Sequence, residues 1–368
     1  MSSPIRGEMW QLGYGIESTY GATGTTCSSI FGVVQSATLP DPANDLKPFW
    51  GLNTVSNRNV YITYRGKQSM QMSLGEFMVI QGDVLGLPIG AASVSGSYVH
   101  NFSQAITLPS LTVGAEYVDA GGSAALYRRW YGGKMGRATY SAREEGFLMM
   151  SCDMLFNGYG YRDFPGTGGS APAGNLTGAT TTGYDATIPV MTLDNPCDEP
   201  YLFSYGALTL DGYPFARVKS FRLSVDNGLQ PKYYVATRTD SAQRVPYEIR
   251  EGRRSYSLSV ETDIERDNEG MRIYRELMAI GEYSNVYKGF VTTFTMTRKR
   301  SGSASMDTIT FTMPGDGTAA CGGNAQGCLI KSAPHNINSN DALVSVNMDI
   351  MVRSASITVA DGNSTYPA

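Results

Sequence analysis

GKQSMQMSL, residues 66–74, alternates polar and apolar side chains with a period of two from Ser69 to Leu74. Met70, Met72 and Leu74 fall on one side of such a segment, and the serines and the glutamine between them fall on the other. This period is typical of a β-strand that packs one face on a core and turns the other to solvent. The same alternation recurs in two later segments, 256–260 and 343–351, so the sequence predicts a mainly β fold.

The chain also repeats itself at about half its length. GRRSYSLSV, residues 252–260, matches residues 66–74 at an offset of 186. Further matches keep the same order at offsets between 183 and 196, pairing 31–39 with 215–223, 46–50 with 229–233, and 147–155 with 343–351. Ordered offsets that drift slowly are typical of a tandem duplication followed by small insertions. Two unrelated β-domains of similar strand composition are the alternative.

A stretch rich in Gly, Thr, Ala and Pro, residues 166–183, lies between the two halves and carries almost no charge. Such a composition is typical of a linker or a long surface loop. We therefore predict a first domain over 1–160, a linker over 161–200 and a second domain over 201–368.

Other strands are expected at 30–39, 110–118, 125–131, 147–155, 215–225, 290–298 and 307–313. Glu144, Glu145 and Gly146 predict a hairpin turn. Residues 268–280 carry apolar side chains at helical spacing and are followed by Gly281, which predicts a helix with a glycine stop. Its counterpart, roughly 76–85, predicts a shorter helix, with a strand as the alternative. Each domain is thus expected to be a β-sheet domain with one packed helix.

Charge and hydropathy exclude several classes of protein. The chain has 368 residues, a net charge of −4 and only 17% charged residues. A protein that grips nucleic acid needs a basic surface to displace counterions from the phosphates. The sequence has no signal-peptide core at its start and no apolar run long enough to span a membrane, which predicts a cytoplasmic site of synthesis.

Candidates for catalysis, cofactor binding or metal binding are poor. The histidines, His100 and His335, are too few for a zinc site or a plausible Ser–His–Asp triad. The odd, scattered set of cysteines forms no disulfide framework, although pairing of Cys321 with Cys328 is left open against free thiols. Arg250, Arg253 and Arg254 form a basic cluster that would contact either phosphates or acidic groups on a neighbouring copy. We predict that the protein is not an enzyme and holds neither a cofactor nor a metal.

Several stretches resemble, in the same order, the major tail tube proteins of long-tailed, siphovirus-like bacteriophages. They are GIESTYG at 15–21, residues 98–102 and 108–113, residues 131–141 with 146–148, and residues 218–229. No single motif is specific, and the collinear order carries the resemblance. It implies two tandem tail-tube-like β-sandwich domains, each with a flanking α-helix, that contribute strands to a large β-barrel between subunits.

In that family, rings commonly contain six domains and stack into a hollow tube, so the resemblance implies a trimeric, pseudo-hexameric ring for a chain with two domains. Four strands from each domain give a barrel of roughly 24 strands and a backbone diameter of roughly 50 Å. The implied protein is part of the virion tail, is assembled in the host cytoplasm and carries double-stranded DNA in transit. Its implied partners are other copies of itself, the tape measure protein, the tail terminator and baseplate proteins.

The alternation predicts which side chains face the lumen: Ser69, Gln71, Ser73, Ser151, Asp153, Ser257, Ser259, Ser345, Asn347 and Asp349. A polar face without excess positive charge would let DNA slide without binding. Two equivalent polar stretches, 40–59 and 226–245, are expected to form loops that reach the next ring. The residues expected at contacts between rings or subunits are Asp45, Lys47, Trp50, Arg58, Lys232, Arg238, Arg244, Arg253 and Arg254.

Other functions stay open at this point. A baseplate hub or distal tail protein would have similar paired domains but would stop at a single ring. A β-rich carbohydrate-binding or adhesin module would need an aromatic platform, and the 23 tyrosines form no obvious cluster in the sequence.

Overall fold

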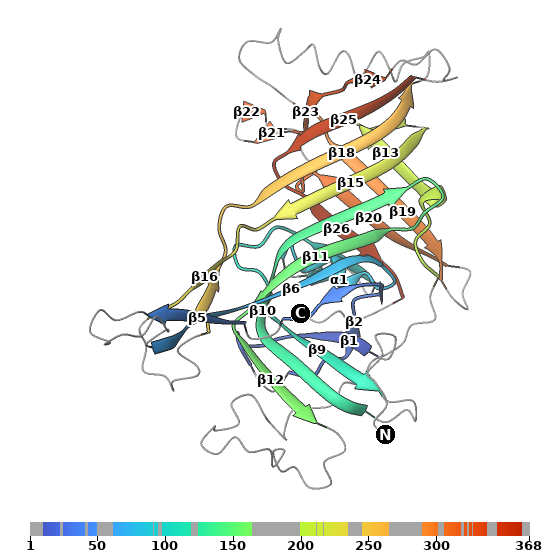
Figure 1. Cartoon of the computed structure of the whole chain (residues 1–368). Coiled ribbons are helices and arrows are strands. Elements are labelled where there is room, and N and C mark those ends of the chain that lie inside the picture. The colour runs from blue at the N-terminus through green and yellow to red at the C-terminus, as the bar shows by residue number, and fades with distance from the viewer. Residues whose placement is uncertain are drawn as a thin grey trace.

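The computed structural model describes residues 10–22, 25–40, 43–49, 62–90, 92–94, 98–118, 124–163, 199–210, 212–215, 217–234, 245–264, 289–300, 305–317, 320–321, 324–325, 327–336 and 344–362. Antiparallel β-strands make up most of these residues (Figure 1), which confirms the predicted mainly β fold. The predicted linker lies almost entirely outside the described residues, as does the helix predicted at 268–280.

A central sheet runs through both halves of the chain. Its strands in spatial order are β3 (Val33–Val34) with β4 (Ala37–Thr38), β6 (Ile62–Met78), β11 (Met149–Phe156), β10 (Ala124–Arg143), β15 (Val218–Asp226), β18 (Ser255–Ile264), β25 (Val344–Val352), and β23 (Leu329–Ser332) with β24 (His335–Asn336). The halves are joined where β10 pairs with β15, from Arg137 opposite Asp226 to Arg143 opposite Ser220.

Two flanking sheets lie against this layer. The first contains β2 (Ser29–Ile30), β1 (Trp10–Ile16), β9 (Leu111–Val118), the start of β10, and β12 (Gly158–Asp163). The second contains β14 (Tyr213–Phe215), β13 (Gly206–Leu210), β19 (Thr292–Lys299), β20 (Met306–Met313), β26 (Ser356–Ala360), β8 (Val99–Phe102) and β7 (Ala92–Val94). β7 and β8 belong to the first half of the chain, so a hairpin from that half extends the flanking sheet of the second half by pairing with β26.

Small elements complete the fold. Strand β5 (Ala43–Phe49) pairs with the start of β6, β16 (Gln230–Lys232) pairs with β17 (Glu248–Arg250), and β21 (Ala320–Cys321) pairs with β22 (Asn324–Ala325). A short 3-10 helix, η2, spans Phe203–Tyr205.

The strand order is the same in the two halves. In the central sheet, β3/β4–β6–β11–β10 corresponds to β15–β18–β25–β23/β24, and in the flanking sheets β1–β9–β10–β12 corresponds to β13–β19–β20–β26. Strand irregularities also correspond: the register shifts between Met135 and Arg137 in β10, and between Ile330 and Ser332 in β23. Each shift lies opposite an aspartate, Asp153 in β11 and Asp349 in β25.

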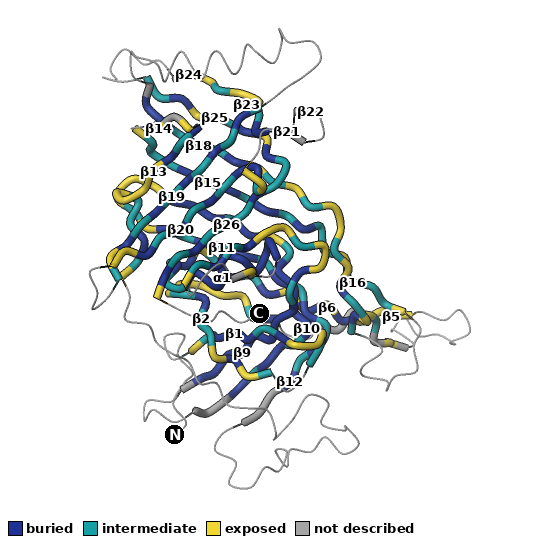
Figure 2. Tube along the Cα trace, turned by 180° about the vertical axis from the view of Figure 1, so that it is seen from behind, coloured by how far each residue is buried: buried dark blue, intermediate teal, exposed yellow. Residues whose placement is uncertain are grey.

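The core lies between the central sheet and the flanking sheets, and the two halves share it (Figure 2). Phe221 of β15 stacks on Phe294 of β19 with ring centroids 4.1 Å apart. Tyr140 of β10 packs edge-on against Phe311 of β20 at 5.3 Å, so a strand of the first half packs on the second flanking sheet. Because buried aromatic rings dominate core energetics, these contacts hold the layers and the halves together.

Two predicted elements need correction. Strand β6 continues to Met78, and the helix α1 covers only Asp83–Gly86, so the helix predicted over 76–85 is wrong for most of its length. The strand predicted at 125–131 continues to Arg143, because the glycines that seemed to end it form an irregularity within the strand. Gly132 adopts a φ of +61°, which favours glycine, and a Cβ on Gly133 would lie 2.4 Å from the Phe156 ring.

The carboxyl group of Asp83 is buried at the start of α1, where its Oδ1 accepts a hydrogen bond of 2.9 Å from the Val84 N–H. Burial raises the pKa of Asp83 to about 6. A raised folded-state pKa means that the folded state holds the proton more tightly, so this stabilising contribution is lost as pH rises from about 4 to about 6.

We expect Asp83→Asn to gain stability relative to the wild type over that interval, by up to about 3 kcal/mol at neutral pH. Urea unfolding of both proteins at pH 4.5 and pH 7.5 measures the difference. A difference that is the same at both pH values would contradict the prediction.

Candidate functional site

The outer face of the central sheet carries the polar residues predicted from the alternation. Among them, Ser69, Gln71, Ser257 and Asn347 are exposed, while Ser73, Ser151, Asp153, Ser259, Ser345 and Asp349 are partly exposed. The alternating apolar residues, Met70, Met72, Leu258, Val346 and Ile350, are all buried. The predicted division between a polar face and a core face therefore matches the burial of these strands. We call this surface the polar face.

The two middle strands of the polar face were not predicted to belong to it. Strand β10 contributes Arg137, Thr139, Ser141 and Arg143, and strand β15 contributes Ser220, Arg222, Ser224 and Asp226. The register places Ser151, Thr139, Ser224 and Ser257 in one row across four strands. The alternation in RATYSAR (137–143) and SFRLSVD (220–226) is the signal that identifies these residues.

Side-chain hydrogen bonds connect neighbouring strands of the polar face. Ser73 donates to Asp153 at 2.6 Å, Thr139 and Ser224 are 3.1 Å apart, and Ser259 donates to Asn347 at 2.9 Å. Cross-strand pairs of this kind stabilise a sheet by roughly 0.2–1 kcal/mol each. The polar groups thus bind one another along the sheet.

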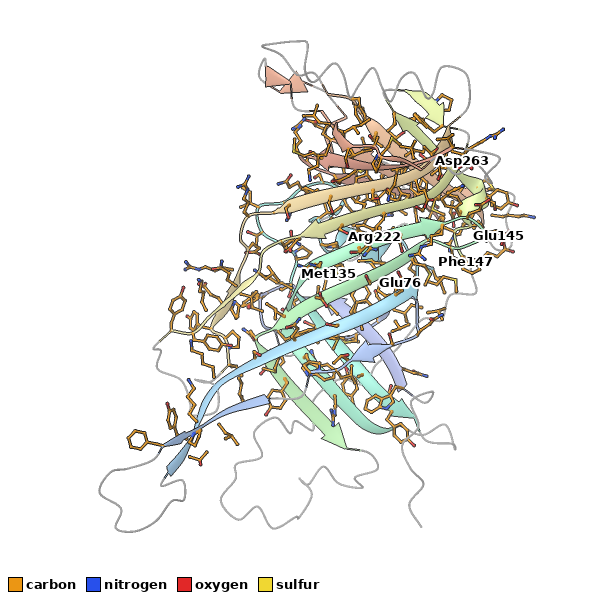
Figure 3. All side chains as sticks on the ribbon, turned by 45° about the horizontal axis from the view of Figure 1, so that its top comes forward. Glu76, Met135, Glu145, Phe147, Arg222 and Asp263 are labelled. Carbon is orange, nitrogen blue, oxygen red and sulfur yellow. The ribbon has the colours of Figure 1, made fainter. Side chains whose placement is uncertain are left out.

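Charges of both signs are mixed on the polar face. Arg137 forms an ion pair with Asp226 at 3.0 Å, and Lys331 lies 3.6 Å from Asp349. A hydrogen bond from the Gly228 N–H, together with Arg137, holds the pKa of Asp226 below its usual range. The charged residues of the face include Arg137, Arg143, Arg222 and Lys331 and, with the opposite charge, Glu76, Asp153, Asp226, Glu261, Asp263 and Asp349. Figure 3 shows Glu76 on β6 and Arg222 on β15. The surface is therefore polar without an excess of positive charge.

Two hairpin arms extend from the same side of the central sheet (Figures 1 and 2). The first arm is β5 with the start of β6, and the second is β16 with β17, so both predicted loop regions contain β-structure. The Tyr233 hydroxyl donates to the Gln68 carbonyl at 3.0 Å, and the Lys67 ammonium lies 4.7 Å from the Tyr233 ring centroid. The two arms therefore contact each other within one chain.

The second arm is anchored to the body at its base. The Lys134 ammonium, which is nearly buried, donates to Glu251 at 2.6 Å and to the Ile249 carbonyl at 3.1 Å. It also lies 5.1 Å from the Tyr20 ring centroid, and the Tyr20 hydroxyl accepts from the Ile249 N–H. These contacts fix where the arm leaves the sheet.

The residues predicted at contacts between copies have different positions. Asp45 and Lys47 lie in β5, Lys232 lies in β16, and Arg253 is exposed between β17 and β18. Trp50, Arg58, Arg238 and Arg244 lie outside the described residues. Arg254 binds within its own chain, donating to Asn227 Oδ1 at 2.5 Å, the Ile89 carbonyl at 2.9 Å and the Ala105 carbonyl at 3.3 Å. These bonds give Arg254 a role in holding loops of the two halves together.

The remaining candidates for chemistry are buried. His100 lies on β8 inside the second flanking sheet, and the thiols of Cys27, Cys152 and Cys328 are free and buried. Cys328 is therefore not paired with Cys321. The described part of the chain contains no cluster of His, Cys, Asp and Glu suited to a metal ion. None of its helices is long and apolar enough to cross a membrane.

The described residues thus form an antiparallel β protein with an extended polar sheet face and two projecting arms. Comparison with family models gives the particular family: the model described as phage tail tube protein matches residues 10–280. Because that match covers well over half of the sequence, the chain belongs to the phage tail tube protein family, whose members are structural components of phage tails. The comparison with curated protein sequences gave no match.

Proposed function

We propose that this chain polymerises into stacked rings that form the hollow tail tube of a long-tailed, siphovirus-like phage, through which DNA passes into the host. The observation that carries the proposal is the repeated strand order within one continuous central sheet. A family member with two such units in one chain needs three chains to supply six units. The proposed ring is therefore a trimer with pseudo-sixfold symmetry.

The proposed units are a tandem duplication. Strand order, the positions of the register shifts and the collinear sequence matches all support this origin. The shared core and the pairing of the β7–β8 hairpin with β26 support the proposal that the two units fold together as one body.

The polar face is the proposed lumen surface. Its hydroxyls and amides bind one another, and its mixed charges leave no row of cations to trap phosphates. The row of Ser and Thr that crosses the seam between β10 and β15 supports a lumen of constant chemistry around the ring. In the proposed virion, the ends of the tube meet the tail terminator and baseplate proteins, and the tape measure protein occupies the lumen before DNA does.

The two arms are proposed to mediate stacking between rings. Deleting residues 42–56 removes β5 and is expected to leave a folded subunit, because the core lies elsewhere. Stacking should be lost, so that electron micrographs show single rings in place of tubes. A deletion of the same length within the linker, 170–184, is the control and should leave tubes intact. Tubes of normal length from the 42–56 deletion would contradict the role of the arm.

Electron microscopy of the unmodified protein also distinguishes the other functions. Single rings that never stack would indicate a hub or distal tail protein. Compact monomers at every concentration would indicate a binding module.

A further inference from the structure

The central sheet ends in two edges with different neighbours. At one edge, the Gly75 N–H donates to the Ser36 carbonyl at 3.0 Å, so Ser36 directs its backbone groups toward β6. Because backbone groups alternate along an antiparallel strand, Ala37 directs its N–H and C=O away from β6. Residues 35–38 are exposed, and none of the described strands pairs with β3 or β4 on that outer side. The opposite edge is formed by β23 and β24.

The pairing of β10 with β15 inside the chain, which we call the seam, indicates which strands the two edges would bind. Strand β15 corresponds to β3/β4: Ala37 lies opposite Leu74 as Phe221 lies opposite Val260, an offset of 184 in this strand. Strand β10 corresponds to β23/β24: Ser141 lies opposite Met149 as Asn336 lies opposite Ser345. In β15, the edge that corresponds to the open edge of β3/β4 is covered by β10.

We propose that β23/β24 of one chain pairs antiparallel with β3/β4 of a second copy, in the register of the β10–β15 seam. This inference rests on the proposed tube function. Within the chain, Ser141 lies opposite Arg222. The corresponding residues are Asn336 and Thr38, so Asn336 of one chain lies opposite Thr38 of the next. The pairing repeats head to tail and closes when the ring is complete.

The pattern of backbone hydrogen bonds also sets the expected distance between the Cα atoms of Thr38 and Asn336. Thr38 is two residues from Ser36, so its backbone groups point toward β6 and not toward the new partner. Thr38 and Asn336 therefore form a non-hydrogen-bonded pair, the type in which Cα atoms approach to about 4.5 Å. Their cross-strand neighbours, Ser73 opposite Thr38 and Ser345 opposite Asn336, both belong to the polar face.

The seam between chains should be weaker than the seam within a chain. Within the chain, the β7–β8 hairpin of the first half also pairs with β26 of the second half, which adds a second layer of contact. The interval that corresponds in sequence, 281–292, has 12 residues against 26 in 86–111, so it offers less chain for a second layer of contact. The weak seams of the ring are therefore the ones between chains.

Cysteine cross-linking tests the register. Thr38→Cys and Asn336→Cys are combined in a chain in which Cys197 and Cys321 are replaced by serine, and the assembled protein is treated with a short bifunctional thiol reagent. We expect covalent species that end at the trimer on denaturing gels. The matched control combines Thr38→Cys with Ser332→Cys, four residues along the edge and about 13 Å out of register, and should cross-link at least tenfold less.

The possible results of the cross-linking experiment distinguish a failure of the proposed strand pairing from a failure of the proposed tube function. Tubes that form without cross-linking of the 38–336 pair would overturn the seam and leave the tube function standing. Equal cross-linking of the 38–332 control would overturn the register. Chains that remain monomeric at all concentrations would overturn both the seam and the proposed function.

Discussion

Replacing Ala37 by proline is expected to weaken assembly severely while leaving the subunit folded. Ala37 lies on the outer edge strand β4, and its N–H points away from β6. Proline removes that N–H and places its ring toward the incoming chain, yet it is tolerated on the open side of an edge strand.

An unsatisfied carbonyl and the steric conflict should cost about 2–3 kcal/mol at each seam between chains, which corresponds to a roughly 30- to 150-fold higher concentration for assembly. Sedimentation velocity measures assembly, and circular dichroism with thermal unfolding measures the fold. Ala37→Ser keeps the N–H and is the matched control. Normal tubes from the proline variant would show that β4 takes no strand partner at this position.

Replacing Asp307 by alanine is expected to be the most destabilising change among the charged residues considered. Asp307 of β20 lies opposite Arg298 of β19, and both side chains are buried inside the second flanking sheet. The carboxylate accepts from Arg298 Nε at 3.1 Å and from Arg300 Nε at 2.8 Å. Arg298 also donates to the carbonyls of Ile80 and Glu199, so the pair connects a loop of the first half to the second half.

Without Asp307, the Arg298 guanidinium stays buried with its counter-charge removed, which typically costs about 3–5 kcal/mol. Urea unfolding in the Ala37→Pro background measures this loss without a contribution from assembly. Asp316→Ala is the control, because Asp316 pairs with Arg353 at the surface, and such pairs contribute about 0–1 kcal/mol. A loss of less than 1 kcal/mol for Asp307→Ala would contradict the importance of the buried pair.

The sequence predicted those parts of the fold in which alternation is clean. Strands β6, β11, β18 and β25 alternate small polar and large apolar residues, so their two faces could be assigned from the sequence alone. Strand β10 was shortened in the prediction, because Gly132 and Gly133 resemble a break, although a register shift accommodates them. The residues that β10 contributes to the polar face were missed with it.

Other features depend on contacts between residues distant in sequence. Arg254 was predicted to contact a neighbouring copy from its place in a basic cluster, whereas its bonds to Ile89 and Ala105 depend on the folding together of the two halves. Arg298 and Asp307 form a buried pair at inward-facing positions of the β19–β20 hairpin. In the sequence, the signal for this pair was two opposite charges at positions that face each other across the hairpin. Pairing between β10 and β15 could not be foreseen from either half alone.

The most direct test of the central claim is negative-stain electron microscopy of the purified protein with rotational classification of end views. The account predicts long hollow tubes whose rings have threefold symmetry within a six-lobed outline. Tubes with six full chains per ring would contradict the two-unit ring while keeping the tube function. Protein that forms no tubes under any assembly condition would contradict the account as a whole.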